Sequence, residues 1–85
     1  MEKLMELYNA SLQKNQILVF RSNINTNKDA TFVCSKLLKI DGIYSATIDL
    51  EDWENILRLE GSSSLLIHEI KKIINNLGFE CSELK

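Results

Sequence analysis

The chain lacks proline and contains only three glycines and two cysteines among its 85 residues. Two cysteines are too few for the disulfide framework that stabilises small secreted proteins. Cys34 and Cys81 lie far apart in the sequence, and neither belongs to a CxxC pair. We therefore expect two free thiols in a reducing, cytoplasmic compartment.

Long apolar runs and a dominant charge are also missing. No apolar run approaches the roughly 20 residues that a membrane-spanning helix needs. Residues 1–15 carry Glu2 and Glu6 where a signal peptide would have its apolar stretch. The formal net charge is −2, with acids and bases mixed along the chain. We expect no membrane insertion, because no segment is apolar over a sufficient length. We also expect no nucleic-acid partner, because this charge balance does not attract a polyanion.

Catalytic machinery is the third absence. The single histidine, His68, has no neighbouring nucleophile on its predicted face, and there is no glycine-rich phosphate loop. Glu51, Asp52 and Glu54 share one turn, but one turn supplies too few oxygens for the roughly six to eight ligands of calcium. A chain this short also has little volume for an enclosed pocket. We expect no enzymatic activity and no cofactor.

The first half of the chain predicts a strand and then a helix. Residues 17–24 are rich in strand-forming side chains, and a polar loop, Asn25–Asp29, then supplies helix-capping groups. The helix is expected to run to about Lys39 and to end at the turn Asp41-Gly42. Alternation along the strand places Leu18, Phe20 and Ile24 on one side, and Ile17, Val19 and Arg21 on the other.

The second half predicts two strands, a helix and a last strand. Residues 43–50 alternate, with Tyr44, Ala46, Ile48 and Leu50 expected on the buried side. An acidic turn with Trp53 leads to a partner strand over 55–60, which Gly61 closes. Three serines, 62–64, are expected to cap a helix with an apolar face, Gly78 to end it, and residues 79–84 to form the last strand.

This β-α-β-β-α-β order predicts an α+β fold, the ferredoxin-like sandwich, with an antiparallel sheet and both helices on one face. The domain is expected to cover residues 16–85, and residues 1–15 to form an N-terminal extension. Leu4, Leu7, Tyr8 and Leu12 share one helical stripe in the extension. Because an isolated helix of this length is marginal, a docked helix and a frayed tail both remain open.

Residues 24–50 and 66–81 resemble the heavy-metal-associated domain of copper chaperones and P-type ATPase metal-binding modules. That family's pattern is a strand, Met-x-Cys-x-x-Cys, a helix, a Gly-Val turn, a hairpin of two strands, a second helix and a Gly-aromatic pair. The matching segments here are Ile24 at the methionine position, Asp41-Gly42-Ile43 at the turn, Ile48-Asp49-Leu50 at the family's Val-Asp-Leu, and Asn76-Leu77-Gly78-Phe79. The resemblance implies that Phe79 stands where an aromatic shields the metal loop.

The resemblance also implies that Thr26 and Asp29 occupy the two cysteine positions. A hydroxyl and a carboxylate are hard donors, whereas Cu(I) prefers sulfur. We therefore expect Asp29 to be a first-turn carboxylate favoured by the helix dipole, and Thr26, or Asn25 or Asn27, to cap the helix. No metal is expected in this loop.

Cys34 and Cys81 are the remaining soft donors. Each is expected to pack as a small apolar side chain, and His68 to point to water. A metal site built from the three would need three separate elements to converge. The alternative function is a heavy-metal binding or transport protein that uses Cys34 and Cys81, with thiols from two chains meeting across a homodimer.

The side of the sheet away from the helices is expected to carry Ile17, Val19 and Ile56 beside Arg21 and Arg58. RNA-binding sheets of this topology carry aromatics there, which these positions lack. A contiguous apolar set indicates a cover, either the leading segment or a second chain.

The preferred function is a protein-interaction module that has lost the family's metal site. The resemblance favours docking around the loop of Asn25, Thr26, Asn27, Lys28 and Asp29, because copper-chaperone-like folds contact partners there. Trp53 at the hairpin tip is the second expected contact, since tryptophan is enriched in binding hot spots. The alternative for Trp53 is partial packing against its own hairpin.

Overall fold

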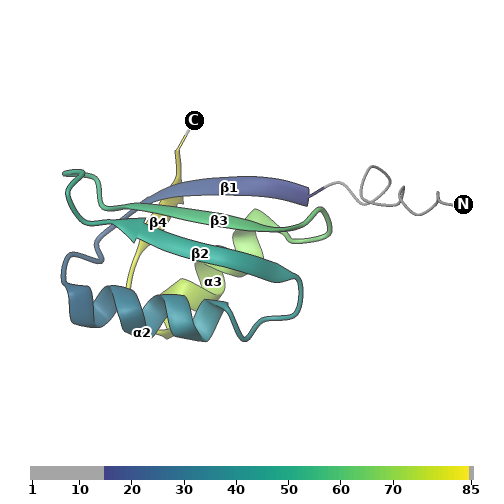
Figure 1. The fold of residues 1–85 in the computed structure, drawn as a ribbon, viewed down its shortest axis with the longest axis horizontal. Coiled ribbons are helices and arrows are strands. Elements are labelled where there is room, and N and C mark those ends of the chain that lie inside the picture. Colours follow the sequence, from purple (N-terminus) through teal and green to yellow (C-terminus); the bar gives the residue numbers. More distant parts are fainter. Residues whose placement is uncertain (1–14, 85) are drawn as a thin grey trace, which may run out of the picture.

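The computed structural model describes residues 15–84, and most of the predicted N-terminal extension lies outside them. The elements are β1 (Asn15–Ser22), α2 (Asn27–Leu37), β2 (Ile43–Asp49), β3 (Ile56–Ser62), α3 (Ile67–Asn76) and β4 (Cys81–Glu83). The four strands form one antiparallel sheet in the order β2-β3-β1-β4. Both helices lie on the same face of this sheet (Figure 1). The predicted ferredoxin-like fold is therefore confirmed.

The core lies between the sheet and the two helices. In β1, Leu18 and Phe20 are buried while Ile17 is exposed, as the alternation predicted. Each helix contributes one apolar stripe to this core. The buried side chains are Leu18, Phe20, Ile24, Val33, Leu37, Ile43, Leu57, Leu59, Ile70 and Ile74. Neither described helix is long and apolar enough to cross a bilayer.

The buried side of β2 begins differently from the prediction. Ile43 is 6% exposed and Tyr44 is 59% exposed, so placing Tyr44 on the buried side was wrong. The register shifts between Ile43, opposite Gly61, and Ser45, opposite Glu60. A bulge there inserts one extra residue and reverses the alternation. Beyond the bulge, Ala46 and Ile48 pack against the core as predicted.

We expected the three serines to cap α3, and they do not. Leu66 is the N-cap residue of α3, and no side chain makes a capping hydrogen bond. Gly61 does not close β3 either, since Ser62 still pairs with Asn15 in the sheet. Ser62 instead ends β3, and Ser63 and Ser64 form the turn after it, in which the Ser64 N–H donates to Ser62 Oγ at 3.2 Å.

Two other boundaries are shorter than predicted. α2 ends at Leu37 and not at Lys39, because the chain tightens into a turn in which the Lys39 N–H bonds to Lys36 O. β4 begins at Cys81 and not at residue 79. The Phe79 N–H donates to Ile74 O at 3.1 Å, so Phe79 belongs to the turn that ends α3.

Candidate functional site

Three connections meet at the end of the sheet where β1 finishes. They are the loop from β1 to α2, the hairpin from β2 to β3, and the turn from α3 to β4, which lie at one end of the molecule (Figure 1). The Ser22 N–H donates to Glu54 O at 3.0 Å, and the Asn23 N–H donates to Glu80 O at 3.1 Å. These bonds tie the three connections into one surface, which we call the loop end.

The loop from β1 to α2 is a helix cap. Thr26 is the N-cap residue with extended backbone angles, φ −128° and ψ 153°, and its Oγ1 accepts a hydrogen bond from the Asp29 N–H at 3.1 Å. Of the three residues predicted as alternatives, Thr26 therefore supplies the cap. Asp29 lies in the first turn, as predicted, where a negative charge is favoured by the positive end of the helix dipole.

The side chains around this loop offer few groups that bind metal ions. Within residues 15–84 no three His, Cys, Asp or Glu side chains gather closely enough to hold an ion. Thr26 and Asp29 offer a hydroxyl and one carboxylate, both hard donors, so they fit poorly to the soft ions that a thiolate pair would hold.

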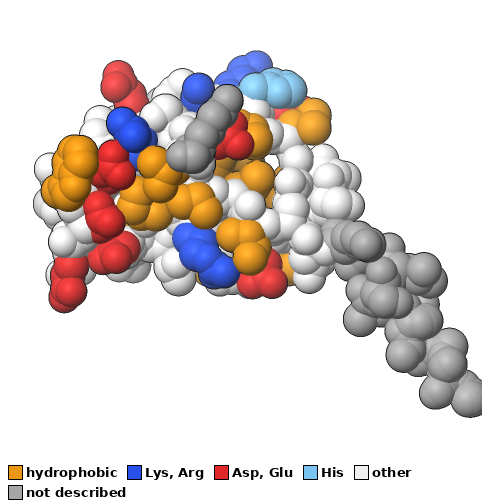
Figure 2. All heavy atoms as spheres, turned by 90° about the horizontal axis from the view of Figure 1, so that it is seen from above, with side chains coloured by type: hydrophobic (Ala, Val, Ile, Leu, Met, Phe, Trp, Pro, Cys, Tyr) orange, Lys and Arg blue, Asp and Glu red, His pale blue; other side chains and the backbone are white. Residues whose placement is uncertain are grey.

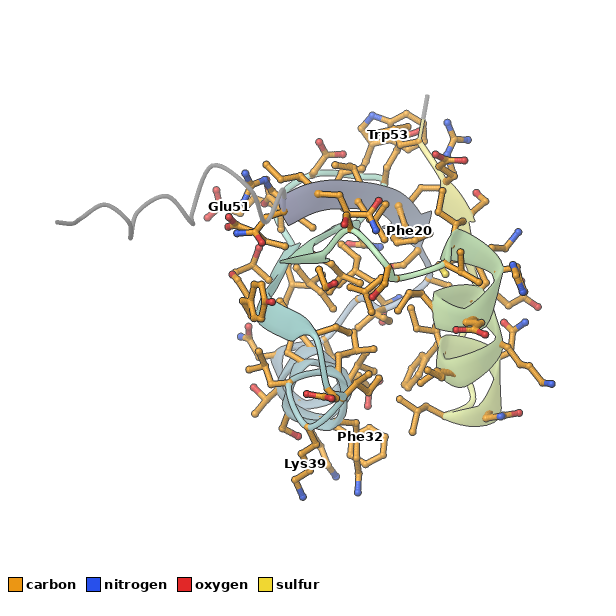
Figure 3. The ribbon with its side chains drawn as sticks, turned by 90° about the vertical axis from the view of Figure 1, so that its right-hand side faces the viewer. Phe20, Phe32, Lys39, Glu51 and Trp53 are labelled. Carbon is orange, nitrogen blue, oxygen red and sulfur yellow. The ribbon has the colours of Figure 1, made fainter. Side chains whose placement is uncertain are left out.

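Trp53 is the most exposed large apolar side chain described. It is 87% exposed at the tip of the hairpin between β2 and β3. Its ring points outward, on the opposite side of the sheet from α2 (Figure 3). Little of the indole therefore packs against its own hairpin, so the exposure gives the predicted alternative of partial packing little support.

The hairpin that carries Trp53 is held by its own hydrogen bonds. Asp52 Oδ1 accepts from the Glu54 N–H at 2.8 Å, and Asp52 O accepts from the Asn55 N–H at 2.8 Å. Asn55 has a φ of +49°, a left-handed conformation that asparagine tolerates better than most residues. The indole is thus presented on a defined turn.

Contacts to β1 fix the same hairpin from outside. Ser22 Oγ donates to Asn55 O at 2.7 Å, and Arg21 forms a 3.0 Å ion pair with Glu54. The sequence did not predict these contacts. The asparagine before a strand is a local signal for the turn, but no local pattern pairs Ser22 on β1 with a carbonyl in the hairpin between β2 and β3.

The turn from α3 to β4 completes the loop end. The Glu80 N–H donates to Asn23 Oδ1 at 2.9 Å, which reciprocates the backbone bond between the two residues. Phe79 packs against the core cluster. Arg21, Asn23 and Glu80 line a shallow open groove beside this turn, together with Ser22, Cys81 and Ser82.

The structure does not bring the two thiols and the histidine together as a metal site. Cys34 is half-buried on α2, Cys81 is half-buried on β4, and His68 is exposed on α3. Burial raises the pKa of both thiols, and nearby Lys71 partly opposes this rise at Cys81. The predicted packing of Cys81 against the core is confirmed.

The fold is shared with solved metal-handling domains. Oxidized MerP from Ralstonia metallidurans superposes with a TM-score of 0.73 at 11% identity, over 85% of this chain and 100% of that one. A copper binding domain from HMA7, a P-type ATPase, gives 0.71 at 18% identity, over 81% of this chain and 93% of that one. The CopZ metallochaperone gives 0.65 at 23% identity, over 81% of this chain and 100% of that one.

No protein-family model matches this chain, and no curated protein sequence matches it. Identities this low establish a common fold and do not by themselves transfer a metal site or an activity.

Proposed function

We propose that this protein is a non-enzymatic interaction domain that keeps the heavy-metal-associated fold without the family's metal site. In this proposal it binds a protein partner through the loop end, using Trp53 and the loop Asn25–Asp29. The observation that carries the proposal is the 87% exposure of Trp53 on a hairpin held by hydrogen bonds.

An exposed indole on a fixed turn is well suited to partner binding. Tryptophan is enriched among the residues that dominate interface energies, because its large ring is buried in a pocket of the partner. Ordering a mobile loop on association costs free energy and weakens binding. A turn that is already ordered in the free protein avoids most of this cost. The Arg21–Glu54 ion pair and the Ser22 bond to Asn55 support this turn before any partner arrives.

The proposed loss of the metal site rests on residue chemistry at the family's cysteine positions. Thr26 caps α2, and Asp29 places an acidic residue in its first turn, so both residues serve the start of the helix. The alternative, a metal site built from Cys34 and Cys81 across a homodimer, has less support. The thiolate is the form that binds metal, and burial raises both thiol pKa values, which lowers the thiolate fraction at neutral pH.

The partner experiment starts from cells in which the full chain carries a photo-crosslinking group beside Trp53. Once a captured protein is purified, its dissociation constant is measured by calorimetry. Trp53→Ala is expected to weaken binding by at least about tenfold. Phe32→Ala is the matched control, since Phe32 is a 42% exposed aromatic on α2, far from Trp53 (Figure 3). Equal affinities for wild type and Trp53→Ala would refute docking through the hairpin.

The metal question has a separate test. Native mass spectrometry of the reduced chain is run with and without one equivalent of Cu(I) or Zn(II) under a competing chelator. We expect no retained metal. Retained metal that disappears in Cys34→Ser or Cys81→Ser would instead support the alternative, and a dimeric mass with metal would place the site between two chains.

A further inference from the structure

The face of the sheet away from the helices carries apolar side chains, of which Ile17 is exposed and Val19, Ile56 and Leu84 are half-buried. Leu18 and Phe20 face the core, so Ile17 and Val19 face the other way. The register places Arg58 opposite Val19, and the neighbouring Ile56 lies two residues before it on β3. We call this side of the sheet the open face. Hydrophobic side chains gather at its centre, with charged groups around them (Figure 2).

The last strand adds to the same apolar group. The Leu84 N–H donates to Val19 O at 2.9 Å, and Ser82 is opposite Arg21, so Leu84 and Val19 share the open face. Ile17 is 51% exposed. The predicted placement of Ile17, Val19, Ile56, Arg21 and Arg58 on this face is confirmed by the register. A contiguous apolar group of this kind marks a contact surface.

Residues 1–14 precede β1 in the chain, and β1 contributes Ile17 and Val19 to this face. Its first residue, Asn15, is two residues before Ile17. The entry point is fixed, because Gln16 Nε2 donates to Ser62 O at 3.0 Å and to Leu65 O at 2.8 Å. The segment therefore starts within reach of the apolar group.

The sequence of residues 1–14 fits that surface. Apolar side chains recur at helical spacing along one stripe, and Ala10 falls on the opposite side of it. The stripe consists of Met1, Leu4, Met5, Leu7, Tyr8 and Leu12. From residue 12 back to residue 4 a helix covers about 12 Å, and β1 covers about 13 Å between Ile17 and Arg21.

We propose that residues 1–14 fold back over the open face as an amphipathic helix, antiparallel to β1. In this arrangement Leu12 lies over Ile17, Tyr8 over Val19, and Leu4 over Ile56, with Gln13 and Lys14 in the returning turn. An isolated helix of this length is marginal in water, and the open face supplies the apolar surface that stabilises it. The domain then has three layers.

Methyl NMR of the full chain tests this arrangement. We expect nuclear Overhauser contacts between the methyl groups of Leu12 and Ile17 and between those of Leu4 and Ile56. A sample that mixes labelled and unlabelled chains is expected to show that these contacts are within one chain. A soluble paramagnetic agent is expected to relax the Ile17 and Val19 methyls only weakly.

Two single-lysine variants complete the test. Leu4→Lys, on the stripe, is expected to abolish the Leu4 contact and to increase paramagnetic relaxation of the open face. Ala10→Lys adds the same charge on the other side and is expected to change neither. Unchanged Leu57 and Leu59 methyl shifts would show that the core still folds. Equal relaxation of Ile17 in wild type and Leu4→Lys, or contacts found only between chains, would overturn the proposal, the second by assigning the face to another copy.

Discussion

Thr26 Oγ1 accepts a hydrogen bond of 3.1 Å from the backbone N–H of Asp29. The resemblance to the heavy-metal-associated pattern implies that these two residues stand at its cysteine positions. In this chain they begin α2 and are bonded to each other through its first turn. This backbone segment thus works as a helix cap. The segment and the two thiols give three testable predictions, and Gly61 gives a fourth.

Thr26→Ala is expected to lower the free energy of unfolding by about 1 kcal/mol, because one N–H of the first turn loses its acceptor. Urea denaturation of the full chain measures the change. Thr26→Ser is the matched control, since it keeps a hydroxyl in place and is expected to lose much less. A Thr26→Ala variant as stable as wild type would show that the hydrogen bond has no net value.

The double variant Thr26→Cys with Asp29→Cys is expected to bind one Cu(I) per chain under a chelator that keeps wild type metal-free. The two side chains would then be thiols, one in the loop and one on the first helical turn, the arrangement that suits a soft ion. Native mass spectrometry counts the metal. Thr26→Cys alone is the control, and equal metal retention by the single and double variants would argue that this backbone does not position a thiolate pair.

Gly61→Ala is expected to destabilise the fold by about 1–3 kcal/mol through overpacking. A methyl group at Gly61 would collide with the backbone oxygen of Gly42 and would lie 2.6 Å from Leu65 Cδ1 and 3.2 Å from Ile43 Cα. That oxygen accepts from the Ser62 N–H at 2.7 Å, so it cannot retreat without weakening the turn.

Thermal or urea denaturation of Gly61→Ala measures the loss. Ser63→Ala, on the exposed turn just beyond β3, is the control and is expected to change stability by less than about 0.5 kcal/mol. An unaltered midpoint for Gly61→Ala would mean that Gly42 and Leu65 move aside freely.

Stability is expected to fall at alkaline pH partly through the two thiols. Burial raises the pKa of Cys34 and Cys81 above the ordinary 9.0, so the folded chain holds these protons when the unfolded chain has begun to lose them. The stability that the protonated thiols contribute to the folded chain is fully present below about pH 9. It is lost as the pH rises through the pKa values of the two thiols in the folded chain.

Urea denaturation at roughly pH 7 and pH 10 measures this effect, because most free thiols ionise between these values. Other groups also titrate there, so the Cys34→Ser, Cys81→Ser double variant is the reference. Wild type is expected to lose more stability than the double variant over this interval. The same loss in both would show that the half-buried thiols do not contribute.

How much the sequence predicted depends on how local each feature is. The sequence predicted that Leu18 and Phe20 face the core and that Ile17 and Val19 face away, because side chains on a strand change face at every residue. Thr26 was among the predicted caps, because capping needs only a short polar side chain and the backbone N–H three residues on. These choices depend on neighbours within one turn or one strand.

Only the tertiary structure decided the features that depend on register and distant contacts. The bulge that turns Tyr44 outward and Ile43 inward follows from how β2 pairs with β3, which the alternation of β2 alone cannot reveal. The presentation of Trp53 depends on Ser22 of β1, whose hydroxyl reaches the carbonyl of Asn55 in the hairpin that carries Trp53. Local periodicity and capping chemistry therefore determined the elements and their order, whereas long-range pairing decided which side chains the loop end presents.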